Sequence, residues 1–308
     1  MATLPTGEQY RIHFGDQSAI ITEQGATLRS YRVGDRDVVL PFGEADSPQG
    51  CQGQHLLPWP NRIRDGRWDL DGVTHQLPLT EVPRHNAIHG LVSWLPWRLT
   101  THTDSTGGPE GAGPTSAGRS IEQRVTVFPQ PGWPGVIECQ VRHTLDARGL
   151  TVEVAVTNLG TVAVPVGYAA HPYLALDAPI DQWRVTAPFD QYLVVDDRLL
   201  PRHLAPVDGT PADLRAVQSF GDRQLDTAFR HVGGPWSVTV SASGHEVELW
   251  TDEGLGWMQV YTPDDRASLA VEPMSCGPDA FNGGETARGL TRLEPDSSVS
   301  WRWGLTAR

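Results

Sequence analysis

Two dipeptides far apart in the chain, His171-Pro172 and Glu272-Pro273, place a proton-transferring side chain directly before a proline. Proline disfavours the helical conformation in the residue before it, so both side chains are expected on extended backbone. Imidazole and carboxylate groups commonly serve as general acid and general base. The two dipeptides therefore indicate acid-base chemistry on a bound ligand if the fold brings them together.

The residues around each dipeptide predict how much space these two side chains have. Side chains alternate between the two faces of a strand. If 167–171 is a strand, His171 shares its face with Gly and Ala residues, and in a strand over 268–272 Glu272 shares its face with Ser and Ala. Small neighbours leave room for a ligand. A histidine hydrogen-bonded inside a core and an ion-paired surface glutamate are the alternative interpretation.

Two further polar clusters precede the histidine. In the segment 58–62 (Pro-Trp-Pro-Asn-Arg), the prolines restrict the backbone and can aim Asn61 and Arg62 from a rigid turn. A forked guanidinium can bind two adjacent sugar hydroxyls, although a surface arginine in a tight loop is also compatible. Gly90 allows a turn that presents His89.

Asp226 and Gln259 are the remaining candidates. Gln259 alternates with Trp257 and Tyr261 in the segment 257–261, which places an amide between two aromatic rings. Sugars suit such sites, because their C–H faces stack on aromatic rings while their hydroxyls take directed hydrogen bonds. An aromatic core stripe is the alternative. Asp226 is either a buried acceptor or the cap of a turn.

The elements that must position these residues are expected to be strands. Alternation recurs between Gly, Pro, Asn and Asp clusters, which is typical of an antiparallel all-β protein, a large sandwich or barrel. A short helix is expected over 211–220, and the polar, glycine-rich tract 101–120 is expected to be a loop within one domain spanning 1–308. The expected strands are 121–127, 150–156, 236–240, 245–249, 257–261 and 299–303.

Composition restricts the classes of partner and location. The net charge of -13 over 308 residues argues against binding to nucleic acid or an anionic membrane. The sequence shows no apolar span of about 18 residues and no secretory signal, so a cytoplasmic protein is expected. Three widely spaced cysteines, Cys51, Cys139 and Cys276, indicate reduced and mostly buried thiols.

Several chemistries lack their required residues. All 24 basic side chains are arginines, so a lysine Schiff base and a lysine-anchored pyridoxal phosphate are excluded. The chain has no zinc helix motif, phosphate-binding P-loop, dinucleotide fingerprint or nucleophile elbow. Carbonyl or hemiacetal chemistry would therefore run on acid and base groups.

Taken together, these motifs resemble the aldose 1-epimerase (galactose mutarotase) family, in a shorter bacterial branch. The resemblance spans nearly the whole chain and implies a large antiparallel β-sandwich with an open carbohydrate cleft, no metal and no cofactor. The segments that carry it, in the family's order, are Asn61-Arg62-Ile63, Ile88-His89-Gly90, Gly167 to Tyr173, Leu225-Asp226, Gln259 to Thr262, Val271-Glu272-Pro273 and Asp279 to Asn282.

The resemblance also implies roles. Glu272 would be the general base that takes the proton of the C1 hydroxyl, and His171 the general acid that protonates the ring oxygen of a free hexose such as galactose or glucose. Nearby Glu272 and Asp226 are expected to keep His171 protonated, because opposite charge favours the charged form. The hydroxyls and ring would be held by Asn61, Arg62, His89, Asp226 and Gln259.

The sequence is compatible with more than one substrate and more than one class of function. After His89-Gly90 the chain reads Leu-Val-Ser-Trp (91–94), without the longer Gly-Phe-Asp segment of many galactose-acting members. A hexose 6-phosphate would need a cationic pocket, for which four arginines are available. A sugar-binding module of the same fold and a glycoside hydrolase using Asp226 with Glu272 are the other classes. Monomer and homodimer both remain open. The four arginines are Arg62, Arg64, Arg67 and Arg84.

Overall fold

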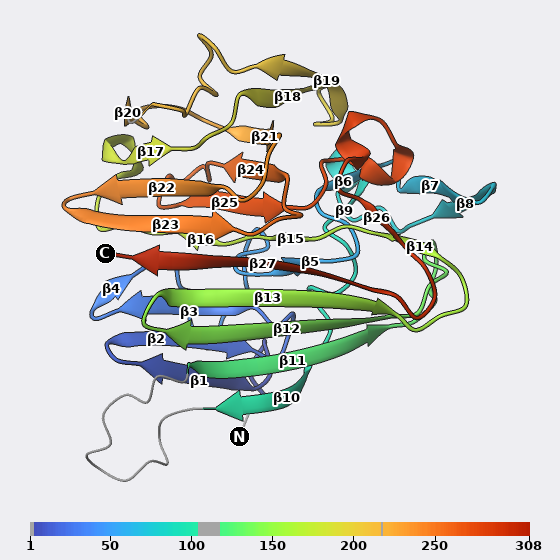
Figure 1. Ribbon diagram of the computed structural model, residues 1–308, viewed down its shortest axis with the longest axis horizontal. Coiled ribbons are helices and arrows are strands. Elements are labelled where there is room, and N and C mark those ends of the chain that lie inside the picture. Colours follow the sequence, from blue (N-terminus) through green and yellow to red (C-terminus); the bar gives the residue numbers. More distant parts are fainter. Residues whose placement is uncertain (1–2, 104–117, 217) are drawn as a thin grey trace.

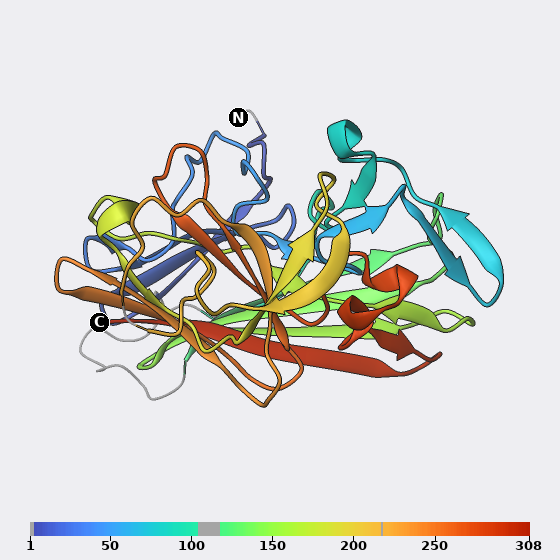
Figure 2. The same ribbon diagram turned by 90° about the horizontal axis from the view of Figure 1, so that it is seen from above.

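The computed structural model describes residues 3–103, 118–216 and 218–308. Its two largest elements are antiparallel sheets of nine and eight strands, and a four-stranded sheet is built from the N-terminal region. Figure 2 shows the nine-stranded sheet as one layer, with the other two sheets packed on the same side of it. The antiparallel all-β prediction is confirmed.

The nine-stranded sheet forms the larger layer and contains five of the six predicted strands (Figure 1). Alternation along its strands gives it one buried face, as in β12, where every second side chain from Ile137 onward is buried. Its order is β10 (Arg98–Thr103), β11 (Arg119–Val127), β12 (Ile137–Asp146), β13 (Gly149–Asn158), β27 (Ser298–Ala307), β23 (His245–Thr251), β22 (Ser237–Ala242), β17 (Arg184–Thr186) and β20 (Gln218–Ser219).

The eight-stranded sheet carries three of the predicted site residues, Asp226, Gln259 and Glu272, on its central strands. The sixth predicted strand, 257–261, is β24 of this sheet. Its order is β19 (Pro201–Pro206), β18 (Gln191–Val195), β21 (Asp226–Arg230), β24 (Trp257–Tyr261), β25 (Leu269–Met274), β15 (Ala169–Ala170) and β5 (His55–Leu56), and β16 (Tyr173–Leu174) also pairs with β25.

The smaller elements complete the layers and the rim. The four-stranded sheet consists of β1 (Gln9–Phe14), β2 (Gln17–Thr22), β3 (Leu28–Val33) and β4 (Arg36–Asp37). Three two-stranded sheets pair β6 (Arg62–Arg64) with β9 (Asn86–Ile88), β7 (Arg67–Leu70) with β8 (Val73–Gln76), and β14 (Val164–Val166) with β26 (Thr291–Leu293). Four short 3-10 helices are described: η1 (Val82–Arg84), η3 (Ile180–Gln182), η4 (Ala280–Asn282) and η5 (Glu285–Ala287).

The main core lies between the layers. It combines inward side chains of the nine-stranded sheet, such as Val141 and Val152, with those of the eight-stranded sheet, such as Val260 and Val271, and with Ile21 of the N-terminal sheet. Burying one such side chain fully contributes about 1.5–3 kcal/mol. A second, smaller apolar cluster forms on the opposite face of the eight-stranded sheet from Leu56, Ala169, Leu193, Ala228, Trp257 and Met274.

The helix predicted over 211–220 is wrong. The described part of this segment consists of turns and bends, and β20 begins at Gln218. Polar side chains bond their own backbone there: Thr210 Oγ1 accepts from the amide of Ala212 at 3.2 Å, and Asp213 Oδ1 accepts from the amide of Arg215 at 3.3 Å. Such bonds compete with helix hydrogen bonding and favour turns.

Most of the loop predicted over 101–120 lies outside the described residues. Its two ends belong to strands, because Thr103 of β10 pairs with Ser120 of β11. All three cysteines are free, and Cys139 and Cys276 are buried while Cys51 is half-buried. No helix in the described ranges has the length and apolar character needed to cross a bilayer.

Candidate active site

The register of three strands places His171 opposite Glu272. Ala169 of β15 pairs with Met274 of β25, and Tyr173 of β16 pairs with Ala270, so the residues midway between these pairs face each other. The ladder is interrupted there. Proline has no amide hydrogen to give to a ladder, so a proline after each of these two residues opens the sheet at this place.

The predicted alternation of faces is confirmed. Tyr168 and Ala170 on one side, and Leu269 and Val271 on the other, belong to the main core, so the two reactive groups point away from it. The strand is shorter than predicted, since only Ala169–Ala170 of 167–171 is assigned to β15.

Gly167 has a packing role instead of the predicted one of leaving space for a ligand. A Cβ atom at this position would lie 2.4 Å from Cys276 Sγ. The missing side chain therefore lets the segment after β25 and the segment before β15 approach closely.

The two reactive groups are in direct contact. His171 Nε2 lies 3.3 Å from Glu272 Oε1, and the side chains keep 6% and 3% of their exposure. The Tyr173 ring stacks on the imidazole at 5.0 Å with an angle of 17° between the planes. Glu272 Oε2 and His171 Nδ1 are buried without a hydrogen-bond partner. Buried polar atoms are normally satisfied, so these two atoms have hydrogen-bonding capacity that the protein leaves unused.

The expectation that carboxylates keep His171 protonated is wrong, because burial has the larger effect. Burial lowers the pKa of His171 to about 4. Burial, with a smaller contribution from the charge of Asp226, raises the pKa of Glu272 well above its usual value, while Arg62 opposes that rise. Desolvation favours the uncharged form of each group. At a pH between these two pKa values the pair therefore carries one proton.

Gln259 and Asp226 extend this row across the sheet. Gln259 of β24 pairs with Glu272 of β25. Its amide Nε2 donates to Asp226 Oδ1 at 2.6 Å. Tyr261 is half-buried beside them, but Trp257 is fully buried in the second apolar cluster, with its indole N–H donating to the carbonyl of Arg288 at 3.1 Å. Only one of the two predicted aromatic faces is thus accessible to a sugar.

Asn61 and Arg62 approach the row from the start of β6. Asn61 has a left-handed backbone (φ 53°), and its amide Nδ2 lies 3.5 Å from Gln259 Oε1. Arg62 Nη1 donates to Asn61 Oδ1 at 3.2 Å. The rest of the guanidinium is occupied, since Nε and Nη2 each donate to a different oxygen of Glu81 at 2.9 Å. Arg62 is therefore a fixed side chain.

His89 reaches the row from the end of β9. Its ring lies edge-on to His171 with centroids 5.6 Å apart, and its Nδ1 is buried without a partner. Burial and the charges of His171 and Arg62 lower the pKa of His89 well below its usual value. The predicted turn is present: Gly90 has φ 74°, and a Cβ there would lie 2.0 Å from the carbonyl oxygen of Leu57.

All seven predicted site residues thus converge on one face of the eight-stranded sheet. Sequence reasoning missed Tyr173 as the ring that stacks on His171, although it follows the dipeptide by one residue. It also missed Glu81 and its neighbour Asn86, which donates to Glu81 Oε2 at 2.9 Å. Glu81 lies between an exposed helix and a loop, and no local pattern marks it as the partner of Arg62.

The described residues contain no group of three or more His, Cys, Asp or Glu side chains arranged to hold a metal ion. The cluster can move protons and donate several hydrogen bonds to hydroxyl groups. It consists of one acid-base pair in contact, two amides, a fixed arginine, a second imidazole and Asp226 at a half-buried rim.

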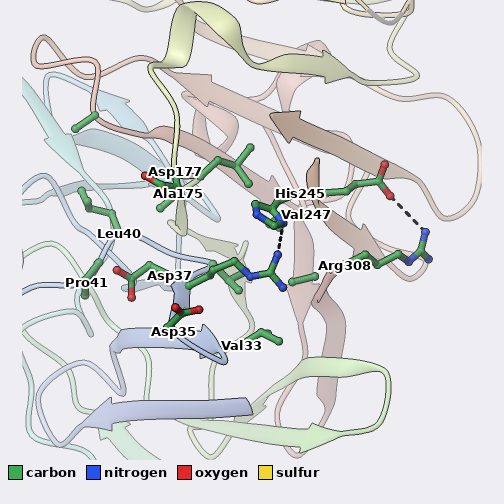
Figure 3. Close-up of a pocket in the computed structure, with 16 residues that line it drawn as sticks. Val33, Asp35, Asp37, Leu40, Pro41, Ala175, Asp177, His245, Val247 and Arg308 are labelled. Carbon is green, nitrogen blue, oxygen red and sulfur yellow. Dashed lines mark hydrogen bonds and ion pairs between the residues drawn. The ribbon is translucent and has the colours of Figure 1, made fainter. Parts of the chain in front are cut away.

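A separate cavity of about 440 Å³ lies between β4, the segment after β16 and the start of β23 (Figure 3). It contains none of the predicted site residues. Arg36 donates to His245 Nδ1 inside it, and Arg308 pairs with Glu246 at 3.3 Å on its edge. The imidazole of His245 is thus already engaged by an arginine.

Comparison with known proteins gives a consistent picture. The model of the family described as aldose 1-epimerase matches residues 8–306. The uncharacterised protein YihR of Escherichia coli is 31% identical over 283 residues, covering 91% of this chain and 87% of that protein. The galactose mutarotase of Rattus norvegicus is 30% identical over 241 residues, covering 71% of this chain and 64% of that protein.

A solved structure shares the fold. The galactose mutarotase-like protein of Clostridium acetobutylicum superimposes with a TM-score of 0.83 at 17% identity, covering 97% of this chain and 94% of that one. The predicted fold class is therefore confirmed as that of the galactose mutarotase-like proteins.

Proposed function

We propose, because this chain belongs to the aldose 1-epimerase family, that it interconverts the α and β anomers of a free, unphosphorylated aldose by general acid and base catalysis. The observation that carries the proposal is the contact of Glu272 with His171 at 3.3 Å, where each group keeps one buried polar atom without a partner. A carboxylate and an imidazole in this arrangement can reach the two oxygens bonded to C1 of a cyclic sugar.

In the ring-opening step, Glu272 takes the proton of the C1 hydroxyl. The electron pair of that O–H bond forms the C1 carbonyl, the bond between C1 and the ring oxygen breaks, and the ring oxygen takes a proton from His171. The aldehyde then turns about the C1–C2 bond. On closure the former ring oxygen returns its proton to His171, and the carbonyl oxygen takes the proton from Glu272. One positioned acid or base typically contributes about 10²–10⁴-fold in rate.

A pair that carries one proton has the protonation that this cycle needs. With the proton on His171 the pair can open the ring, and with the proton on Glu272 it can close it. The free protein favours the second form, because burial lowers the pKa of His171 to about 4 and raises that of Glu272. The kcat/KM of the free protein should therefore fall on the acid side near pH 4, where the pair takes up a second proton.

The surrounding side chains support a ring held by its hydroxyls. Arg62 Nη1, the amides of Asn61 and Gln259, and Asp226 offer donors and acceptors at the edge of the row, and we propose that they and His89 bind the sugar during the turn about C1–C2. Holding the open chain in place keeps the carbonyl beside the pair until the ring closes.

The charges around the site favour an uncharged sugar over a hexose 6-phosphate. Arg62 and Arg84 both donate to Glu81, and Arg64 pairs with Asp279 at 3.2 Å. Three of the four arginines considered for a phosphate pocket are thus already engaged by two carboxylates, Glu81 and Asp279. Arg64 and Arg67 lie on strands of two different sheets, because β6 pairs with β9 and β7 with β8.

The proposal is tested by polarimetry on freshly dissolved α-anomers of several free aldoses and hexose 6-phosphates, with a nitrophenyl glycoside as a separate substrate. We expect faster mutarotation of at least one free aldose and no nitrophenol release. Acceleration confined to the phosphates would move the assignment to hexose-6-phosphate 1-epimerase. Nitrophenol release would favour a hydrolase, and sugar binding without acceleration would favour a binding module.

A further inference from the structure

We propose that Glu81 is a positioning residue for sugar binding, which fixes the guanidinium of Arg62 so that one edge faces the substrate. The inference rests on the proposed function. Glu81 is not in the row that faces the ligand. It lies directly before the short helix η1, in the segment that leads into β9, and acts through Arg62.

The contact between the two side chains is a bidentate ion pair in a sheltered place. Arg62 Nε donates to Glu81 Oε2 and Nη2 donates to Oε1, each at 2.9 Å, and the side chains keep only 8% and 11% of their exposure. Bidentate pairs of this type constrain geometry as well as adding energy. Burial alone would raise the pKa of Glu81, but hydrogen bonds from Arg62 and Asn86 hold it below its usual value, so the carboxylate stays charged.

The pair determines which part of Arg62 is left for the sugar. With Nε and Nη2 engaged, Nη1 is the remaining nitrogen, and it points to Asn61 Oδ1 at 3.2 Å. Asn61 in turn contacts Gln259 Oε1 at 3.5 Å. The Nη1 end of the guanidinium is therefore directed toward the row beside Glu272. A flexible arginine would lose up to about 2 kcal/mol of rotamer entropy on binding, and a fixed one has already lost it.

Glu81 is itself held from two sides. Asn86 Nδ2 donates to Glu81 Oε2 at 2.9 Å, and Arg84 Nη1 donates to Oε1 at 3.1 Å. Arg198, in the connection between β18 and β19, donates from Nη2 to Asn86 Oδ1 at 3.2 Å. The Glu81 carboxylate thus connects Arg62 on β6, through Asn86, with the connection between β18 and β19.

These contacts form one continuous series of side-chain hydrogen bonds. It runs from Asp226 through Gln259, Asn61 and Arg62 to Glu81, and then through Asn86 to Arg198. Four members are proposed sugar ligands, and the last three lie behind them. A change at Glu81 should reach the substrate through Arg62 alone, because Arg62 is the link between the two halves of the series.

The test compares Glu81→Gln with Glu122→Gln, a matched control. Glu122 is also a buried glutamate held by arginines, with Arg124 and Arg142 as partners, but it lies on β11 of the other sheet. With the best aldose of the panel, we expect Glu81→Gln to raise KM about tenfold while kcat changes less, because Arg62 binds cyclic and open forms alike. Glu122→Gln should leave both constants unchanged.

A double-mutant cycle separates positioning from a general structural role. If Glu81 acts through Arg62, then Glu81→Gln should have little further effect on kcat/KM in an Arg62→Ala background. The same loss in both backgrounds would overturn the inference. So would an unchanged KM in Glu81→Gln.

Glu81→Asp provides a second variant if Glu81→Gln does not fold. It keeps the charge but withdraws the carboxylate by one methylene, so KM should still rise. A wild-type KM in Glu81→Asp would overturn the inference. A wild-type protein that accelerates no aldose would overturn both this inference and the proposed function, whereas an active wild type with unaffected Glu81 variants would overturn this inference alone.

Discussion

The molecule contains two pairs of neighbouring histidines, one on each face of the eight-stranded sheet. In the site, His89 and His171 have ring centroids 5.6 Å apart. In the core, His55 and His143 are 5.4 Å apart. Burial lowers the pKa in all four residues. Spacing and a depressed pKa therefore do not distinguish a site from a core.

The difference between the pairs lies in their partners and in access to solvent. His55 Nδ1 contacts the Tyr168 hydroxyl at 3.1 Å, and the Trp303 indole donates to the same hydroxyl at 2.8 Å, so its partners are neutral. His171 instead contacts a carboxylate, and His89 is partly exposed. A second group that can exchange a proton, together with a path for the ligand, is what makes a buried histidine useful in catalysis.

The largest expected effect on kcat comes from replacing Glu272, the carboxylate that contacts a histidine of the site pair. Glu272→Gln keeps the size of the side chain but removes the base, so kcat for mutarotation should fall about 10²–10⁴-fold. Polarimetry against the uncatalysed rate measures this, with circular dichroism as a check of folding. Equal acceleration by variant and wild type would refute the role of Glu272 and remove the distinction drawn between the two pairs.

Replacing one histidine of each pair by glutamine should lower kcat by very different factors. His171→Gln retains a nitrogen donor but cannot carry the proton, so we expect kcat to fall about 10²-fold or more. His55 lies on the other face of the sheet, so His55→Gln should change kcat by a small factor only. The comparison requires both variants to have the wild-type circular dichroism spectrum. Similar losses in both would mean that the core network contributes to catalysis.

The core pair should change how the free energy of unfolding depends on pH in the acid range. The pKa of His55 is 6.5 in the unfolded chain and about 3 when folded, so the unfolded state binds the proton first as the pH falls. The contribution of the neutral, buried His55 is complete above pH 6.5 and is lost between about pH 6.5 and 3, at about 1.4 kcal/mol per pH unit. Urea unfolding of His55→Gln should therefore show a shallower loss of stability on acidification than wild type. Parallel curves would contradict this.

The smallest expected effect concerns the interrupted ladder on the site face. Pro172→Ala and Pro273→Ala each restore an amide hydrogen and loosen the unfolded chain, and each should cost about 1 kcal/mol or less in the free energy of unfolding. Thermal and urea unfolding measure it. A much larger loss would show that the prolines hold the backbone in a conformation that alanine does not adopt.

The parts of the site predicted from the sequence were those with local causes. Proline after His171 and Glu272 and the alternation of small and large neighbours identified the two side chains and their common face. Glu81 and Arg198 were not predicted, because they contact Arg62 and Asn86 only across segments that are distant in the sequence. The protonation of the pair also depends on burial, which no local pattern reports. Gly167 was misread since its neighbour Cys276 is more than a hundred residues away.

The reactive row crosses paired strands at the centre of a sheet, whereas the segment 90–95 that follows His89 is a run of bends and turns that buries Val92 and Ser93 and exposes Trp94. Strand pairing on both sides of β25 keeps the spacing of the proton-transferring groups independent of the length of that segment. We therefore expect that changes in segment 90–95 can alter which sugar the site accepts without moving Glu272 or His171.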